Sequence, residues 1–245
     1  MKKTQKKPVT HTDILLNYNS KFEVTESYKS IRTNIMYSMP KTDSAKVIVI
    51  TSAFPSEGKT TTCINLALTF AQTNAKVLII DCDLRKPKIH RYLNLERKVG
   101  ISNVLCGFAE LNDAIKTGVR ENLDVLTSGE TPPNPAELLG SSEFEAMVNN
   151  LKKSYDYIFI DTPPINVVTD ATLAIKHSTG TILIIRQHHT TYDMLEEALG
   201  KLQKVNANLI GTVLIDAKES KFNYSRRYLR RYYGKYRYYR SKYSD

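Results

Sequence analysis

The residues most able to do chemistry follow an apolar segment near position 50. The run V-I-V-I at 47–50 leads into A-F-P-S-E-G-K-T at 53–60, with Ala53 where the usual pattern begins with glycine. A buried strand that enters such a loop and then a helix binds nucleotide phosphates, because backbone N–H groups and the helix N-terminus point at the anionic oxygens. In this pattern Lys59 reaches the β- and γ-phosphates and the Thr60 hydroxyl binds Mg²⁺. The expected nucleotide contacts are Ser56, Glu57, Gly58, Lys59, Thr60 and Thr61.

Two further apolar runs end in carboxylates. The run at 77–80 precedes Asp81 and Asp83, and the run at 157–160 precedes Asp161. In open α/β sheets ligands bind at the carboxyl ends of parallel strands, so we expect these three strand ends to converge on one crevice. Mg²⁺ takes one or two carboxylates in addition to phosphate oxygens, and Asp161 with one of Asp81 and Asp83 suits that role. The remaining aspartate is then free to accept a proton from a hydroxyl or to orient a water.

These motifs lie within an alternation of strands and helices. We expect strands near 46–51, 77–81, 123–126, 156–161, 181–186 and 209–215, and helices near 59–73, 101–106, 110–116, 135–153, 168–177 and 191–205. A further helix at 23–38 has an apolar stripe formed by Val24, Tyr28, Ile31 and Ile35. Strands that are apolar almost throughout are typical of a parallel sheet covered by helices on both faces. The sequence therefore predicts an α/β fold with a P-loop NTPase-like parallel sheet flanked by helices.

The charge of the chain is concentrated at its ends. The net charge is +10, yet residues 11–217 carry 21 basic and 23 acidic side chains, whereas 1–10 hold four lysines and no acid. We expect a flexible basic arm at 1–20, a P-loop domain at 21–217 and a basic tail at 218–245. No apolar run approaches the roughly 18 residues that span a bilayer, and the N-terminus lacks an apolar signal segment. The expected location is the cytoplasm.

The tail combines basic and aromatic residues and has few aliphatic side chains, so we expect it to be largely disordered. It holds ten Lys and Arg residues against two acids, together with eight of the fifteen tyrosines of the chain. These tyrosines are Tyr224, Tyr228, Tyr232, Tyr233, Tyr236, Tyr238, Tyr239 and Tyr243. Three interpretations compete: a nucleic-acid-binding arm, a membrane-surface arm and a cluster of phosphate acceptors. Composition alone favours the first, and a phosphate-transfer site on the same chain favours the third.

Taken together, these features resemble the bacterial tyrosine kinases that control capsular and exopolysaccharide synthesis. The resemblance extends over nearly the whole chain: the helix at 26–34, the P-loop, the Asp-x-Asp-x-Arg and Asp-x-Pro-Pro strand ends, and the terminal tyrosine cluster. It implies that Lys59 and Thr60 hold ATP and Mg²⁺, and that Asp83 and Asp161 serve the metal. It also implies that Asp81 accepts the proton of the attacking tyrosine and that Arg85 supports the site.

The resemblance also predicts an assembly. In this family a Glu-x-x-Arg-x-x-Arg helix builds a ring in which the tail of one subunit reaches the site of its neighbour. The corresponding residues are Glu26, Lys29 and Arg32, and Lys29 loses the bidentate pairing that an arginine would give. The implied partners are a membrane adaptor of the Gram-positive arrangement, which activates the kinase and recruits it to the inner face of the plasma membrane, a cognate tyrosine phosphatase, and polysaccharide synthesis enzymes as substrates. No nucleic-acid partner is expected.

Two other functions compete with the kinase. A partition-type or septum-type P-loop ATPase would dimerise around ATP and use the basic tail on DNA or membrane. Such proteins usually carry an extra lysine near the start of the P-loop, whereas this chain has Phe54 there and no lysine between Lys46 and Lys59. A protein that only binds nucleotide would have no need of a spare carboxylate, which argues against a pure binding module.

Overall fold

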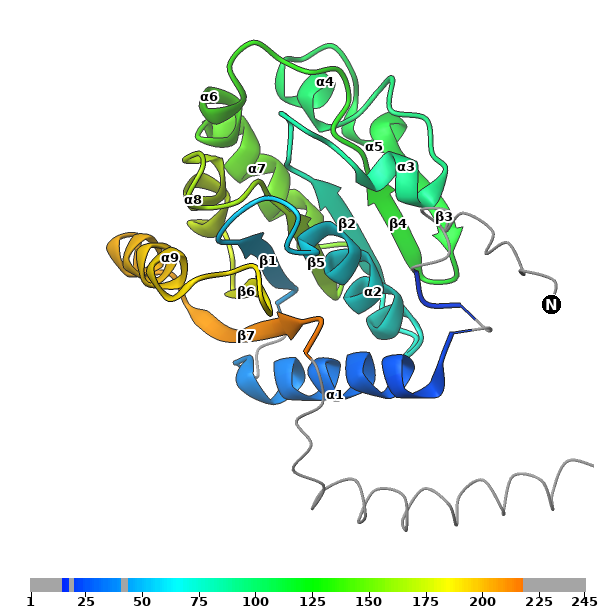
Figure 1. Cartoon of the computed structure of the whole chain (residues 1–245). Helices are drawn as coiled ribbons and strands as arrows, with labels where there is room; N and C mark the ends of the chain where they lie inside the picture. The colour runs from blue at the N-terminus through cyan, green and yellow to red at the C-terminus, as the bar shows by residue number, and fades with distance from the viewer. Residues whose placement is uncertain (1–14, 18–19, 41–43, 218–245) are drawn as a thin grey trace, which may run out of the picture. The chain divides into compact units, whose positions relative to one another are not determined.

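The computed structural model describes residues 15–17, 20–40 and 44–217 (Figure 1). The first compact unit of the chain ends at Ile215 and contains all the helices and strands given below. Most of the predicted basic arm lies outside the described residues, and so does the tail with its eight tyrosines. The predicted boundaries at 20 and 217 therefore stay predictions.

A seven-stranded sheet forms the centre of this unit, in the order β3-β4-β2-β5-β1-β6-β7. The strands are β1 (Lys46–Ser52), β2 (Val77–Asp81), β3 (Ile115–Arg120), β4 (Leu123–Leu126), β5 (Tyr157–Asp161), β6 (Gly180–Arg186) and β7 (Leu209–Ile215). All neighbouring pairs are parallel except β3 and β4. The register places Asp81 opposite Asp161, and Asp161 opposite Ile50. The three predicted strand ends therefore lie side by side at one edge of the sheet.

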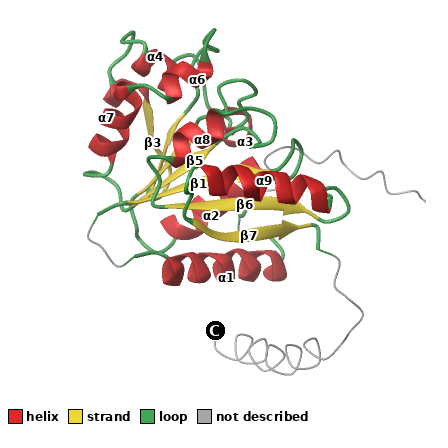
Figure 2. Cartoon of the chain, turned by 90° about the vertical axis from the view of Figure 1, so that its left-hand side faces the viewer, coloured by secondary structure: helices red, strands yellow, loops and turns green. Residues whose placement is uncertain are grey.

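Helices cover both faces of the sheet. They are α1 (Phe22–Ser38), α2 (Lys59–Ala71), α3 (Ile89–Leu93), α4 (Ile101–Leu105), α5 (Leu111–Ala114), α6 (Pro135–Leu139), α7 (Ser142–Leu151), α8 (Asp170–Ile175) and α9 (Tyr192–Lys204). Figure 2 shows α1 and α9 on opposite sides of β6 and β7. Alternate residues of β1 feed two separate cores: Val47 and Val49 pack in one, and Ile48 and Ile50 in the other. Burial on both faces explains why this strand is an unbroken apolar run.

The sequence prediction is confirmed for the α/β class and for every strand that it placed, and it is wrong at one edge of the sheet. The helix expected at 110–116 is only the four-residue α5, and the chain continues directly into β3. This strand pairs antiparallel to β4 and has no fully buried residue, so its sequence lacks the apolar run that identified the other strands. Gly118 adopts φ +64° where the register shifts, which interrupts any regular alternation.

One further helix prediction is corrected, and one short helix was not predicted. The helix expected at 135–153 is two helices, because the chain turns at Gly140 and Ser141. The Ser141 hydroxyl accepts a hydrogen bond from the Phe144 N–H (3.2 Å) and so caps the second helix. The short helix α3 was not predicted, since five residues are too few to show a helical period. Among the described residues, no helix combines the length and apolar character that a membrane crossing requires.

Candidate active site

The phosphate-binding loop joins β1 to α2 at the centre of the sheet. Gly58 has φ +84° and precedes the first helical residue, Lys59. A side chain at Gly58 would meet nothing closer than Ile215 at 3.7 Å, so the left-handed backbone is what requires glycine there. Ala53, at the position where the usual motif has glycine, is fully buried. The helix behind the loop is buried along nearly its whole length, which fixes its N-terminus in space.

Lys59 lies between two aspartates at the adjoining strand ends. Its Nζ is 2.9 Å from Asp83 Oδ2 and 3.4 Å from both carboxylate oxygens of Asp161. The Thr60 hydroxyl donates a hydrogen bond to Asp161 Oδ2 (2.7 Å). Burial by itself would lower the pKa of Lys59, but the charges of Asp161 and Asp83 outweigh it and raise that pKa above its ordinary value. The lysine is therefore a permanent cation in this site.

Asp81 is the third carboxylate of the cluster and is held by the backbone. It accepts hydrogen bonds from the N–H groups of Asp83 (3.2 Å) and Ile89 (3.3 Å) and is fully buried. Burial and the neighbouring charge of Asp161 raise the pKa of Asp81 well above the ordinary aspartate value. Burial also raises the pKa of Asp161, although Lys59 offsets part of this effect. The convergence of Lys59, Thr60 and the three aspartates was predicted from the strand ends, and the structure shows it.

Arg85 forms a bidentate ion pair with Asp170 at the start of α8. Arg85 Nε donates to Asp170 Oδ2 (2.8 Å) and Nη2 donates to Oδ1 (3.0 Å). The Asp170 side chain is completely buried, whereas that of Arg85 is 42% exposed. Asp170 was not predicted as a site residue, because its only local signal in the sequence is an acid near the start of the helix expected at 168–177. Arg85 thus links the loop after β2 to α8.

The side chain of Glu57 is fully buried in the protein. Its carboxylate accepts hydrogen bonds from the Phe54 N–H (2.8 Å) and from the hydroxyl of Thr190. The neighbouring Ser56 is exposed and Thr61 is half-buried at the start of α2. Thr190 follows β6 and belongs to no motif that the sequence predicts. A nucleotide contact by Glu57 would therefore use its backbone N–H.

The predicted interface residues lie on α1 and differ in their contacts. Lys29 Nζ is 2.9 Å from Glu26 Oε1 within the helix. Arg32 Nη1 instead donates to the carbonyl of Thr69 in α2 (2.6 Å). Arg32 therefore ties two helices of the same chain together in this structure. The interface between subunits that we expect these three residues to form stays a prediction.

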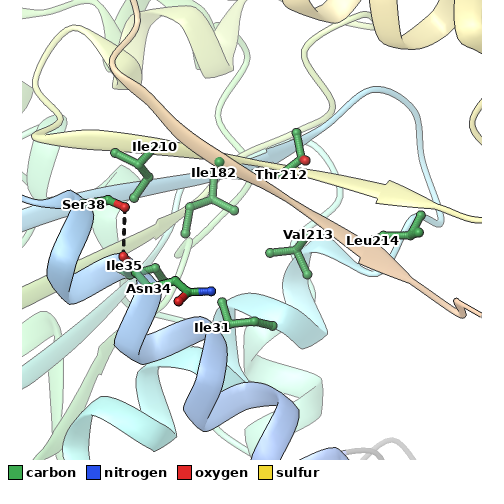
Figure 3. Close-up of a pocket in the computed structure, with 10 residues that line it drawn as sticks. Ile31, Asn34, Ile35, Ser38, Ile182, Ile210, Thr212, Val213 and Leu214 are labelled. Carbon is green, nitrogen blue, oxygen red and sulfur yellow. Dashed lines mark hydrogen bonds between the residues drawn. The ribbon is translucent and has the colours of Figure 1, made fainter. Parts of the chain in front are cut away.

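A groove lies beside α1 and apart from the phosphate-binding loop. It has a volume of about 350 Å³ and runs between α1 and the strands β6 and β7 (Figure 3). Ile31, Ile35, Ile182 and Val213 line it, and the Ser38 hydroxyl at its end donates to the Asn34 carbonyl (2.8 Å). None of its lining residues belongs to the loop or to the aspartate cluster.

Comparisons with known proteins identify the class of protein to which this chain belongs. Residues 45–213 match the family described as the AAA domain, which places the chain among the P-loop nucleotide-binding proteins. The putative tyrosine-protein kinase CapB of Staphylococcus aureus is 38% identical over 223 residues, which are 89% of this chain and 97% of the relative. The kinase domain of the Escherichia coli tyrosine kinase ETK superposes with a TM-score of 0.80 at 28% identity, covering 89% of this chain and 84% of that domain. The chain belongs to the capsule-associated family of bacterial tyrosine kinases, and it is a protein-tyrosine kinase.

The competing ATPase class gives a weaker match. The septum site-determining protein MinD of Pyrococcus horikoshii, solved as a complex with Mg-ADP, has a TM-score of 0.61 and 25% identity over 72% of this chain and 72% of that protein. The shared part is the P-loop fold. The predicted resemblance to the bacterial tyrosine kinases is therefore confirmed, and the match to the septum-type ATPase is weaker.

Proposed function

We propose that this chain transfers the γ-phosphate of ATP to the tyrosine cluster in the tail of a neighbouring copy of itself, and thereby regulates capsular or exopolysaccharide synthesis and export. The observation that supports this most strongly is the meeting of Lys59, Thr60 and three strand-end aspartates at the phosphate-binding loop. A site that only binds nucleotide has no use for the third carboxylate.

The residues present fit a magnesium ion. The Thr60 hydroxyl donates a hydrogen bond to the Asp161 carboxylate, and Lys59 Nζ contacts both Asp161 and Asp83. Three groups with hard oxygen ligands, which Mg²⁺ prefers, therefore lie close together. Three carboxylates against one ammonium group leave an excess of negative charge where a polyphosphate must bind. When bound, Mg²⁺ would offset that charge and stabilise the developing charge on the phosphate oxygens. Thr60, Asp83 and Asp161 are the residues that would hold it.

The remaining roles follow from the side-chain contacts. Lys59 exchanges its contacts with Asp83 and Asp161 for the β- and γ-phosphates when ATP binds. Asp81 is held by backbone N–H groups rather than by Lys59, so it is the carboxylate left to accept a proton. A tyrosine hydroxyl has a pKa near ~10, and a positioned base therefore helps it to attack at neutral pH. Arg85 keeps the loop that carries Asp83 in place through Asp170.

The proposed partners follow from family membership. A membrane adaptor would supply a cytoplasmic segment that activates the kinase and would recruit it to the inner face of the plasma membrane. A cognate tyrosine phosphatase would reset the tail, and polysaccharide synthesis enzymes would be further substrates. A ring built through α1 would bring one subunit's tail to its neighbour's site.

Mass spectrometry of the phosphatase-treated protein after incubation with Mg·ATP tests the proposal. The incubation is run with and without a candidate adaptor segment, and we expect phosphate on tyrosines within 218–245 at least when the segment is present, and none in Lys59→Met. Removing Lys59 also leaves two buried carboxylates unpaired, so this variant should be less stable by about 3 kcal/mol in the absence of nucleotide. Circular dichroism must show that it remains folded at the assay temperature.

Lys201→Met is the matched control for the loss of a lysine. Lys201 forms an ion pair with Glu197 (2.8 Å) and donates to the Asn166 carbonyl (3.1 Å), contacts that together should contribute about 1–2 kcal/mol, and it is not one of the site residues. Its tail should be labelled like that of the wild type. ATP hydrolysis without any tyrosine phosphate, even with an activating segment present, would instead support the ATPase with a nucleic-acid or membrane arm.

A further inference from the structure

The first half of the phosphate-binding loop needs support from outside the loop. Ser56 has φ +67°, a left-handed conformation that a residue with a side chain seldom adopts. Gly58 repeats this conformation two residues later with φ +84°. A backbone in this shape persists only where surrounding contacts impose it. The contacts that do so come from the turn 186–190, which follows β6.

Glu57 is the first point of support. Its side chain is fully buried, and its two carboxylate oxygens are used separately. Oε2 accepts the N–H of Phe54 (2.8 Å), which ties the start of the loop to its end. Oε1 accepts the hydroxyl of Thr190, and His189 Nδ1 lies 3.6 Å from the same oxygen. The buried carboxylate thus joins the loop to a segment 133 residues away in the sequence.

The hydroxyl of Thr190 has a fixed direction. Its oxygen accepts the backbone N–H of Arg186 (2.9 Å), so its single proton points to Glu57. The turn is closed by its own backbone, since the N–H of Thr190 donates to the Arg186 carbonyl (3.0 Å). Thr190 therefore reaches Glu57 from a rigid base.

Arg186 provides the second point of support. Its Nη1 donates to the carbonyl of Ser56 (2.9 Å), the residue that has the left-handed backbone. A charged donor on this carbonyl fixes the peptide that joins Ser56 to Glu57. The turn therefore holds the loop at two successive residues, one through a backbone carbonyl and one through a side chain.

We propose that the turn 186–190 is a clamp that holds the phosphate-binding loop in its nucleotide-binding shape, with Thr190 and Arg186 as positioning residues. The inference rests on the proposed nucleotide site and adds the residues that preorganise it. Preorganisation lowers the cost of ordering the loop when the ligand binds, so loss of the clamp weakens binding without touching the ligand. A merely structural role would change stability and leave the affinity of the folded protein unaltered.

Calorimetric titration of the full chain with Mg·ADP measures this effect without turnover. We expect Thr190→Val to raise the Kd about tenfold, the loss that corresponds to one hydrogen bond to a charged group. Thr190→Ser keeps the hydroxyl and should stay within about twofold of the wild type. In kinetic assays, Thr190→Val should raise the KM for ATP about tenfold and change kcat much less.

Thr191→Val is the matched control at the next residue. The Thr191 hydroxyl caps α9 by accepting the N–H of Met194 (3.3 Å), so its loss should lower the Tm and leave the Kd for Mg·ADP unchanged. Hydrogen exchange without nucleotide gives a second measurement: the amides of Phe54 and of 56–58 should exchange faster in Thr190→Val than in Thr191→Val. Arg186 is partly exposed, and Arg186→Met should raise the Kd about fivefold. This variant provides the test if Thr190→Val does not fold.

The outcomes separate the clamp from the site itself. Equal Kd values for the wild type, Thr190→Val and Arg186→Met would overturn the clamp and leave the nucleotide site intact. A loss of affinity in Thr191→Val as large as in Thr190→Val would also overturn it, because general weakening of this region would then be the cause. A wild-type chain that does not bind Mg·ADP would overturn the clamp and the proposed function together.

Discussion

Arg85 and Asp170 are the pair of residues through which the catalytic edge of the sheet is fixed to a helix. The carboxylate is fully buried and receives both donors of one guanidinium group at 2.8 and 3.0 Å. A buried carboxylate that loses its partner destabilises the protein, because the group cannot regain water. The same pair holds the loop that carries Asp83. The Arg85–Asp170 ion pair therefore contributes both to stability and to catalysis, and substitutions can separate the two contributions.

Arg85→Ala should lower the free energy of unfolding by about 1–2 kcal/mol, less than for a fully buried pair because the arginine is 42% exposed. It should also reduce kcat for tail phosphorylation at least tenfold. The double variant Arg85→Ala, Asp170→Asn removes the unpaired charge, so it should recover most of the stability, measured by urea unfolding. Recovery of kcat as well would show that Arg85 acts only by neutralising Asp170. Continued loss of kcat would place Arg85 in direct support of the site.

At the scale of elements, α4 packs backbone against backbone on the segment that follows β4. The Ile101 N–H donates to the Thr127 carbonyl (2.8 Å) and the Ser102 N–H to the Ser128 carbonyl (3.1 Å). A side chain at Gly100 would lie 2.2 Å from both the Thr127 carbonyl and the Gly129 nitrogen. Glycine is required at this position because two segments of the backbone approach each other closely, and not because of its own conformation, which is extended rather than left-handed. The docking of α4 thus depends on the absence of one methyl group.

Gly100→Ala should destabilise the protein by about 3 kcal/mol, because backbone atoms cannot move aside as a flexible side chain would. Gly200→Ala is the matched control: it lies in α9 with nothing within 4 Å of its added methyl group. That substitution should stabilise the protein by about 0.5–1 kcal/mol, since alanine restricts the unfolded chain and favours helix. Thermal unfolding of both variants measures the difference. A similar Tm for the two would contradict the predicted close approach.

At the scale of the whole molecule, the charge of the tail sets the expected response to phosphorylation. Residues 218–245 carry ten basic and two acidic side chains, whereas 11–217 are almost neutral. Each phosphotyrosine adds about −1.5 to −2 charges, so modification of all eight would change the tail from +8 to roughly −4 to −8. A basic tail is attracted to the aspartate cluster of a neighbouring subunit, whereas an acidic tail is repelled by it, so phosphorylation would weaken a ring held through the tails.

We expect unmodified protein to form a ring and fully phosphorylated protein to dissociate from it. Light scattering coupled to size-exclusion chromatography measures the mass of each form. Wild-type protein incubated with Mg·ADP serves as the control for bound nucleotide without transfer. The same oligomer size before and after complete phosphorylation would exclude this switch. The effect should weaken at high salt, since exposed charges are screened beyond about 8 Å at physiological ionic strength.

The sequence by itself determined the features that depend on neighbours along the chain. Apolar runs of four or more residues identified β1, β2 and β5, which are buried on both faces, and the strand-end position of Asp81, Asp83 and Asp161 predicted their convergence. The motif ending at Thr60 identified the phosphate-binding loop. The edge strand β3 was not predicted, because the residues of a partly exposed strand need not be apolar.

Only the tertiary structure decided which distant side chains meet around that loop. Asp170 lies 85 residues from Arg85, and Thr190 lies 133 residues from Glu57, so no local spacing relates them. Arg32 likewise contacts Thr69 in another helix. These contacts depend on the order of strands in the sheet, which places β6 beside β1 and the end of β5 beside that of β2. The local sequence thus sets the chemistry of each strand end, and the strand order sets the partners that hold it.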